Sequence, residues 1–315
     1  MKKETSNPGT GTVHKKSLKQ QIYYYRSFYI MFIPVFIFAV VFHYLPMLGI
    51  RYSLFSYKGI KAPEFIGLAN FERMFSMPGF WSAFGNTILL SVVKLLLNTF
   101  MAVLISILLN ELRFMKFKKV TQTIVYLPHF MSWVVISYIV YAVLTPEKGY
   151  LNNIIVALGG TKIMWYQEPK YWPFILVLVN TWKMVGYNCI LYYATICGID
   201  HSLYEAAVMD GANRWHQITY ITLPCLKSTI IILTLMNLGN IFRSDFGLFY
   251  QIPMNSGALL EVTNTIDTYV YRGLMQTNNI GMSSAAGVYQ SIVGFVLVFT
   301  ANMIVRKIDS DSSLF

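Results

Sequence analysis

Charged residues are scarce in this chain: Asp, Glu, Lys and Arg make up only 12% of its 315 residues, about half the share of a typical soluble domain. Hydrophobic residues account for 55% of the chain, and they are gathered in long apolar runs. Both observations exclude an ordinary water-soluble domain. They indicate that lipid is the solvent for most of the chain.

Cysteines and catalytic motifs are also few. The three cysteines, Cys189, Cys197 and Cys225, form no C-x-x-C pair, so the sequence offers no disulfide framework. It has no phosphate-binding loop G-x-x-x-x-G-K followed by Ser or Thr, no H-E-x-x-H and no G-x-S-x-G. His43 and His129 have no second ligand at helical spacing and are expected to pack rather than to bind metal. We therefore expect no catalytic residue, no metal site and no cofactor in this chain.

Apolar runs long enough to cross a bilayer, which takes about 20 residues, occur along the whole chain. Backbone groups in lipid must satisfy their hydrogen bonds within the segment, so each run is expected to be a helix. The predicted fold class is all-α, a polytopic membrane protein with six transmembrane helices in a membrane domain at 28–306. The helices are predicted at 28–50, 86–110, 121–144, 173–197, 228–250 and 286–306.

The positions of Lys and Arg predict the orientation in the membrane. The short loop ELRFMKFKK at 111–119 is the clearest basic segment, and basic loops tend to stay in the cytoplasm. This makes 1–27 a cytoplasmic N-terminal segment and 307–315 a cytoplasmic tail, with one long cytoplasmic loop at 198–227. The net charge of +11 then reflects topology and contact with anionic membrane lipid, and we expect no nucleic acid partner.

The cytoplasmic loop reads GIDHSLYEAAVMDGANRWHQITYITLPCLK. It contains Glu205-Ala206-Ala207, then Gly211, then the string ITLP at 221–224, directly before the fifth apolar run. This pattern resembles the EAA motif in permease subunits of binding-protein-dependent ABC importers of the maltose type. The resemblance implies a type I ABC importer permease fold. It also implies that about 202–224 forms a coupling helix that docks on a cytoplasmic ATPase subunit.

The residue types in this loop suit a short docking helix. Asp200, or a capping box formed by Ser202 and Glu205, would begin the helix. Gly211 permits a sharp turn at its end, and Pro224 is expected to close the segment before the next span. An ordinary amphipathic loop helix is the alternative interpretation. The residues predicted to couple to the ATPase are Glu205, Ala206, Ala207, Asp210, Gly211 and Arg214.

Other stretches resemble narrower groups. Residues 65–71 and 80–87 resemble the opening of sugar-importer permeases, and IDTYVYR at 266–272 resembles permeases for polygalacturonan, rhamnogalacturonan and aldouronate fragments. The resemblance implies import of oligosaccharides delivered by an extracellular solute-binding protein. It implies a second homologous permease subunit in a heterodimer, and two ATPase subunits that bind ATP and Mg. The alternatives are a permease for a non-sugar solute and an ATPase-independent channel or secondary transporter.

Polar residues inside two apolar runs predict a substrate pathway, because such residues are costly in lipid. Three of them share one face of the fourth run and two share a face of the fifth, with Arg243 beside them. In the maltose-type family the sugar lies between the corresponding spans, and amides, hydroxyls and a ring suit a sugar. The predicted pathway residues are Asn180, Lys183, Tyr187, Asn237, Asn240 and Arg243.

The cations within the runs allow several interpretations. Lys183 lies too deep in the fourth run to reach an interface, so it should face protein or a wet cavity. Lys183 and Arg243 either pair with an acidic group such as Asp245 or recognise a uronate carboxylate. The asparagines alternatively hold helices together. Lys94 lies nearer the outer end of the second run and is expected to snorkel.

Overall fold

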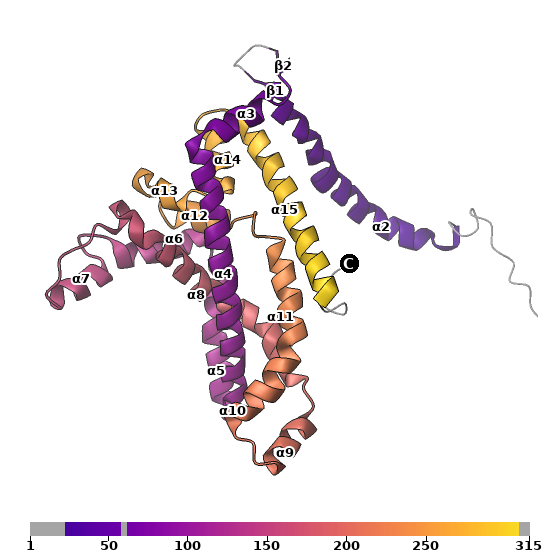
Figure 1. The fold of residues 1–315 in the computed structure, drawn as a ribbon, viewed down its shortest axis with the longest axis vertical. Helices are drawn as coiled ribbons and strands as arrows, with labels where there is room; N and C mark the ends of the chain where they lie inside the picture. Colours follow the sequence, from indigo (N-terminus) through magenta and orange to yellow (C-terminus); the bar gives the residue numbers. More distant parts are fainter. Residues whose placement is uncertain (1–22, 58–61, 309–315) are drawn as a thin grey trace, which may run out of the picture. The chain divides into compact units, whose positions relative to one another are not determined.

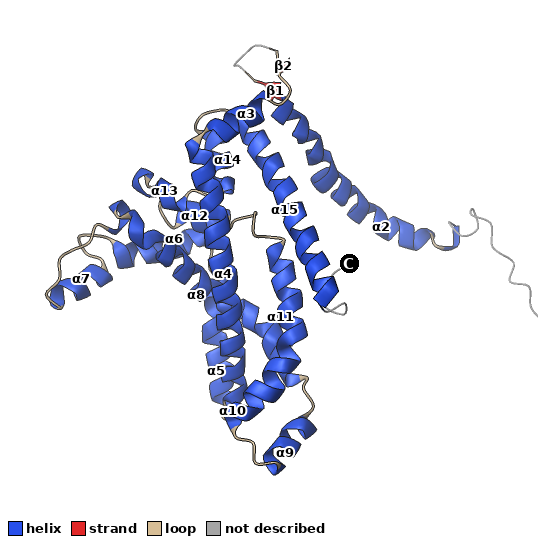
Figure 2. Cartoon of the chain, viewed as in Figure 1, coloured by secondary structure: helices blue, strands red, loops and turns tan. Residues whose placement is uncertain are grey.

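A computed structural model describes residues 23–57 and 62–308 of the chain. The described residues are almost entirely helical, and the only strands among them are one short antiparallel pair (Figures 1 and 2). Within these residues, five helical segments are long and apolar enough to cross a membrane, and a bent helix pair makes a sixth if it counts as one span. The predicted all-α polytopic fold is therefore confirmed. Contacts divide the chain into two parts, Met1–Arg51 and Tyr52–Phe315, which are described separately.

The described residues of the first part form most of one continuous apolar helical segment, Arg26–Leu54. The last three residues of this segment, 52–54, belong to the second part. The segment consists of α2 (Arg26–Ala39), a π-helical turn η1 (Val40–Tyr44) and a 3₁₀ stretch η2 (Leu45–Leu54). No side chain of α2 is buried, as expected for a helix that meets lipid or another protein around its whole circumference. The predicted first span at 28–50 lies within this segment.

The second part is built on two long helices, α4 (Pro78–Glu111) and α8 (Trp172–Cys197), which pack along each other. Their shared core includes Ala102 and Leu109 of α4 with Val185 and Cys189 of α8. Helix α15 (Ile280–Ile308) is the last span. All three helices cover the predicted runs, but α4 and α15 begin earlier, at 78 and 280 rather than at 86 and 286.

The third predicted span, 121–144, is broken. Helix α5 (Met115–Tyr126) continues into the 3₁₀ turn η3 (Leu127–Phe130), and α6 (Trp133–Leu144) leaves at an angle of 101°. Pro128 has no N–H to donate and its ring clashes with the carbonyl four residues before it, so the helix cannot continue regularly. Ser132 then caps α6, accepting a hydrogen bond from the Val135 N–H at 3.2 Å.

The fifth span differs most from its predicted position at 228–250. A continuous helical segment runs from Arg214 to Leu238 and consists of α10 (Arg214–Gln217), the π-turn η6 (Ile218–Thr222) and α11 (Leu223–Leu238). The expectation that Pro224 closes the loop was wrong, because the helical segment runs through Pro224, which lies in the first turn of α11 directly after the π-turn η6. After Leu238 the backbone is irregular until α12 (Phe246–Gln251).

Short elements complete the second part. Strands β1 (Phe55–Ser56) and β2 (Glu64–Phe65) pair antiparallel. Helix α3 (Ala69–Ser76) precedes α4, and α7 (Tyr150–Ala157) follows α6. The remaining elements are the 3₁₀ turns η4 (Trp165–Gln167), η5 (Pro169–Tyr171) and η7 (Gly257–Leu259), and the helices α9 (His201–Met209), α13 (Leu260–Thr263) and α14 (Ile266–Met275).

Candidate transport cavity and coupling loop

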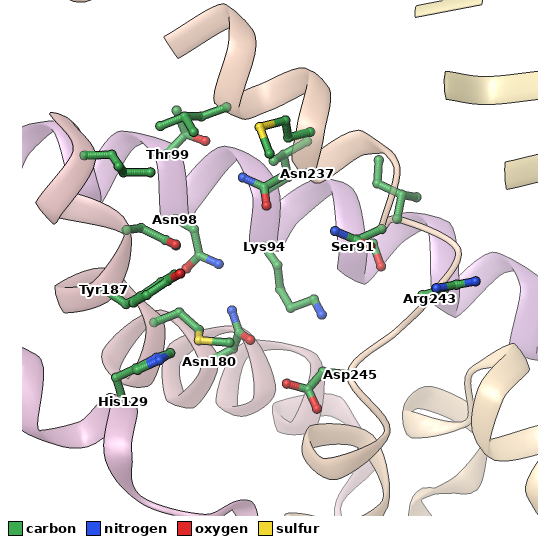
Figure 3. A pocket seen from close by; sticks show the side chains of 18 of the residues that line it. Ser91, Lys94, Asn98, Thr99, His129, Asn180, Tyr187, Asn237, Arg243 and Asp245 are labelled. Carbon is green, nitrogen blue, oxygen red and sulfur yellow. The ribbon is translucent and has the colours of Figure 1, made fainter. Parts of the chain in front are cut away.

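A cavity of about 480 Å³ lies in the second part, between the middles of α4 and α8, the end of α11 and the irregular segment that follows it (Figure 3). Its wall combines amide, hydroxyl and aromatic groups with a small number of charges. The polar lining residues are Ser91, Lys94, Asn98, Thr99, His129, Asn180, Tyr187, Asn188, Tyr192, Asn237, Asn240, Arg243 and Asp245.

The structure brings together all but one of the predicted pathway residues. Asn180 and Tyr187 reach the cavity from α8, Asn237 from the last turn of α11, and Asn240 and Arg243 from the irregular segment. The end of α11 at Leu238 is what turns this segment into the cavity wall. Non-helical backbone is tolerated at membrane depth only where it is buried in protein or lines a polar cavity. Whether these residues contact substrate stays a prediction.

Lys183 is the exception, because the structure does not bring it to the cavity with the other predicted residues. It is 6% exposed and does not line the cavity. Its ammonium donates hydrogen bonds to the carbonyl oxygens of His129, at 2.8 Å, and Met131, at 2.6 Å. No ion pair joins it to Asp245 within the part of the chain that the structure describes. Lys183 does face protein, as its depth required, but its partners are the carbonyls exposed where the third span breaks.

Lys94 is the cavity residue that sequence reasoning missed. Figure 3 shows its side chain extending from α4 into the cavity. The expectation that it snorkels rested on a helix beginning at 86, whereas α4 begins at Pro78 and ends at Glu111. Lys94 is therefore at the middle of the helix, about 24 Å from either end. Pro78 was the signal that could have extended the helix, because proline suits a first helical turn.

The carboxylate in the cavity is hydrogen-bonded, whereas the two cations form no ion pair within the described chain. Asp245 caps α12 by accepting from the backbone N–H groups of Gly247 and Leu248 at 3.1 and 3.4 Å, and its other oxygen accepts from Trp133 Nε1 at 2.7 Å. Neither Lys94 nor Arg243 forms an ion pair with a carboxylate among residues 23–57 and 62–308. The cavity thus presents two cations and one carboxylate that is already engaged.

The cavity wall offers an aromatic ring pair and buried polar atoms that have no hydrogen-bond partner in the described chain. The rings of His129 and Tyr187 are stacked, with centroids 4.4 Å apart and planes 9° from parallel. The buried atoms Asn98 Oδ1 and His129 Nδ1 have no hydrogen-bond partner in the described chain, although such buried groups are normally satisfied. An aromatic face, several amides and two cations can together hold a hydroxyl-rich, anionic molecule. No group of three metal-ligating side chains occurs among the described residues.

The predicted coupling loop forms a separate short helix, α9, which carries Glu205, Ala206 and Ala207. Asp200 is its N-cap and accepts from the Ser202 N–H at 2.9 Å. The alternative capping box formed by Ser202 and Glu205 is therefore not used. The same hydrogen bond stabilises the ionised carboxylate, so the pKa of Asp200 lies below its ordinary value.

The end of α9 is a tight turn around Asp210 and Gly211. Gly211 has φ +77°, and Arg214 begins the next helix, where it lies 4.0 Å from the Glu111 carboxylate at the end of α4. The predicted coupling helix at 202–224 is thus shorter than expected, because its second half belongs to the base of the fifth span. A hydrogen bond of 2.9 Å between the hydroxyls of Tyr204 and Thr222 joins α9 to that base.

Comparison with known proteins gives consistent results over most of the chain. Residues 102–310 match the family described as binding-protein-dependent transport system inner membrane component. The polygalacturonan/rhamnogalacturonan transport system permease protein YteP of Bacillus subtilis (strain 168) is 35% identical over 93% of this chain and 92% of its own length. The lactose transport system permease protein LacF of Rhizobium radiobacter is 30% identical over 82% of this chain and 86% of its own.

A solved structure extends the comparison to the fold. A chain in the crystal structure of a bacterial ABC transporter involved in the import of the acidic polysaccharide alginate is 33% identical. It matches with a TM-score of 0.86 over 93% of this chain and 100% of its own. A second structure shows the bacterial alginate ABC transporter in complex with an alginate pentasaccharide-bound periplasmic protein, with a TM-score of 0.85.

Proposed function

Because this chain belongs to the family of inner membrane components of binding-protein-dependent transport systems, we propose that it is the multi-pass permease subunit of an ATP-driven importer for oligosaccharides. The observation that carries the proposal is the cavity between the middles of the apolar helices α4 and α8, lined by amides, hydroxyls and a stacked ring pair. These groups match the hydroxyls and apolar faces of a sugar.

The proposed assembly contains a second homologous permease subunit, two cytoplasmic ATPase subunits that bind ATP and Mg, and an extracellular solute-binding protein. The sequence contains no phosphate-binding loop of its own, which supports separate ATPase subunits. The similar alginate transporter was crystallised in complex with a periplasmic protein, which supports the binding protein. Both termini are proposed to be cytoplasmic. The segments 1–22 and 309–315, within the two proposed terminal segments, lie outside the described residues.

The proposed coupling element is α9 with its C-terminal turn. It projects from the end of the bundle formed by α4, α5, α10 and α11, as Figure 1 shows. Leu203, Val208 and Met209 of α9 are exposed, Met209 by 87%. A protruding helix with exposed apolar side chains suits docking on an ATPase subunit, and its attachment to the base of the fifth span suits transmission of movement as a rigid body.

The charges favour an acidic oligosaccharide as cargo. Neither Lys94 nor Arg243 has a carboxylate within ion-pair distance among the described residues, and a lysine at the middle of a span is retained only where something balances its cost. A uronate carboxylate would supply that balance. A similar protein is named for polygalacturonan and another for alginate, both acidic, whereas a third is named for lactose. Among these cargoes, the cavity charges of this chain favour the acidic ones.

Uptake of trigalacturonate and of its neutral methyl ester tests this cargo. Purified importer is reconstituted in vesicles and supplied with saturating, cargo-loaded binding protein. Because a hydrogen bond to a charged group contributes about 1.5–3 kcal/mol, Lys94→Met should reduce uptake of the acid by roughly 10- to 100-fold and leave uptake of the ester nearly unchanged.

The matched control is Lys148→Met, which removes an exposed lysine from the loop before α7 and should alter neither rate. Equal losses of acid and ester in Lys94→Met would contradict an acidic cargo. Uptake by this chain without ATPase subunits would contradict the importer itself and favour a channel or secondary transporter.

A further inference from the structure

The break in the third span leaves backbone carbonyl groups without helical hydrogen-bond donors inside a predicted membrane span. His129 lies in η3 and Met131 directly follows η3, so both carbonyl groups lie where the chain turns by 101° towards α6 and the regular helical hydrogen bonding is interrupted. Each unpaired backbone group costs several kcal/mol in a bilayer, where no water can replace the missing partner. The break is therefore stable only if another element supplies donors.

Lys183 of α8 supplies both donors. Its ammonium bonds the His129 carbonyl at 2.8 Å and the Met131 carbonyl at 2.6 Å, and it lies 5.2 Å from the centroid of the Trp133 ring. A lysine at this depth is also costly when it has no partner. Each therefore stabilises the other, and α8 becomes attached to both sides of the break.

One helical turn further along α8, Tyr187 contacts the same residue in a second way. Its ring stacks on the His129 ring at 4.4 Å, and both rings line the cavity. Residues 183 and 187 share one face of α8 because they are four apart. Helix α8 thus contacts His129 twice. Lys183 donates a hydrogen bond to the His129 carbonyl, and the Tyr187 ring stacks on the His129 ring.

On the far side of the break, Trp133 extends the connection. Its indole N–H donates to Asp245, which lines the cavity and caps α12. The ring fits there only because residue 247 is glycine, since a Cβ at Gly247 would overlap the Trp133 side chain. Lys183 therefore lies between two cavity walls, the stacked rings on one side and Asp245 on the other, while it lines neither.

We propose that Lys183 is a positioning residue for cargo binding: it fixes the broken third span so that the His129 and Tyr187 rings form a flat wall against the sugar. The proposal rests on the proposed function of the cavity. It differs from direct recognition of a uronate by Lys183, because a wall that is misplaced weakens the binding of every sugar, charged or neutral. Lys183 and Lys94 thus have separable roles.

A double-mutant cycle tests the proposal. The dissociation constants of trigalacturonate and of its methyl ester are measured by calorimetry for the assembled importer, held with ATP by hydrolysis-deficient ATPase subunits. Lys183→Met and Tyr187→Leu should each weaken the binding of both sugars by about 10-fold. The double variant should be little weaker than either single variant, because both changes disturb the same wall. Lys183→Arg, which keeps charged N–H donors for the two carbonyls, should stay within about three-fold of the unmodified importer.

Asn237→Ala provides the comparison, because Asn237 lines the cavity from α11. Its effect should multiply with that of Lys183→Met, since the two residues share no contact. Multiplied effects of Lys183→Met and Tyr187→Leu, or a loss confined to the acidic sugar, would overturn the positioning role. If Lys183→Met does not assemble, Lys183→Gln carries the same cycle, because its neutral side chain is one bond shorter and so weakens both bonds to the carbonyls.

The same measurements separate this inference from the proposed function. If the unmodified importer binds neither sugar, or if Asn237→Ala has no effect on either dissociation constant, the cavity is not the cargo site and both proposals fail. If Asn237→Ala weakens binding but Lys183→Met does not, the cavity remains the cargo site and only the positioning role is lost.

Discussion

Gly211 offers a test of the coupling loop in which backbone conformation is the only variable. The residue has φ +77°, and no heavy atom lies within 4 Å of the position that a Cβ would occupy. The N–H of Gly211 donates to the Val208 carbonyl at 3.0 Å, and the N–H of Ala212 donates to the Ala207 carbonyl at 2.8 Å. This pair of bonds is a Schellman motif, which requires a left-handed residue at the position of Gly211.

The magnitude follows from that geometry. Alanine pays about 1–2 kcal/mol to adopt the left-handed conformation, and no steric contact adds to or offsets this cost at Gly211. Gly211→Ala should therefore reduce the population of the native turn relative to its open forms by roughly 5- to 30-fold. Asparagine visits the left-handed region far more readily, so Gly211→Asn should lose much less.

The assay is the number of ATP molecules hydrolysed per sugar imported by vesicles that contain the assembled importer. A loosened turn lets the ATPase subunits move without moving the fifth span, so Gly211→Ala should raise this ratio and Gly211→Asn should stay close to the unmodified protein. Gly67→Ala is the matched control, because Gly67 also has positive φ, +57°, and open space at its Cβ position, but lies far along the chain from the loop. An unchanged ratio in Gly211→Ala, or an equal rise in Gly67→Ala, would refute a mechanical role for the turn.

Two further substitutions test what holds the fold together. Asn152 is fully buried and makes four hydrogen bonds, to the Pro146 and Ile163 carbonyls, the Ile163 N–H and Trp165 Nε1. Asn152→Ala should therefore destabilise the loop at 146–165 by about 3 kcal/mol and speed its proteolysis. Asn153→Ala, at an exposed neighbouring position, should do neither. A Cβ on Gly186 would overlap the backbone of Val125, so Gly186→Ala should separate α8 from α5 and lower the melting temperature of the purified protein, whereas Gly287→Ala, with open space, should leave it unchanged.

The sequence predicts the fourth span almost to the residue. Its proposed limits, 173–197, match α8 at Trp172–Cys197 because Pro173 suits a first helical turn and Gly198 follows the last one. The Gly211 turn was predictable for a similar reason, since a glycine after a short helix supplies the left-handed residue that ends it. Both features depend on local chemistry, which a single sequence contains in full.

The fifth span shows where local patterns fail. The predicted run 228–250 combines the end of α11 with α12, although seven residues between them are irregular. Leu248 and Phe249 of α12 are fully buried in a core with Leu90 and Trp172, so their hydrophobicity serves packing inside the protein rather than contact with lipid. Hydropathy cannot separate these two uses of an apolar residue, and it consequently joined two elements into one span.

The two lysines at membrane depth show why the candidate site could be predicted only in part. A sequence indicates how deep a residue lies, and by that measure Lys94 and Lys183 face the same cost. What distinguishes them is which partner each one meets. The partners of Lys183 are carbonyls that become free only because the third span breaks more than 50 residues earlier in the chain. The Lys94 ammonium instead lies 4.7 Å from the centroid of the Phe249 ring, and no described carboxylate lies within ion-pair distance of it. A charge that the fold already satisfies stabilises the protein. A charge that the fold leaves without a carboxylate at ion-pair distance remains available to cargo, and this difference is the basis on which we propose recognition for Lys94 and positioning for Lys183.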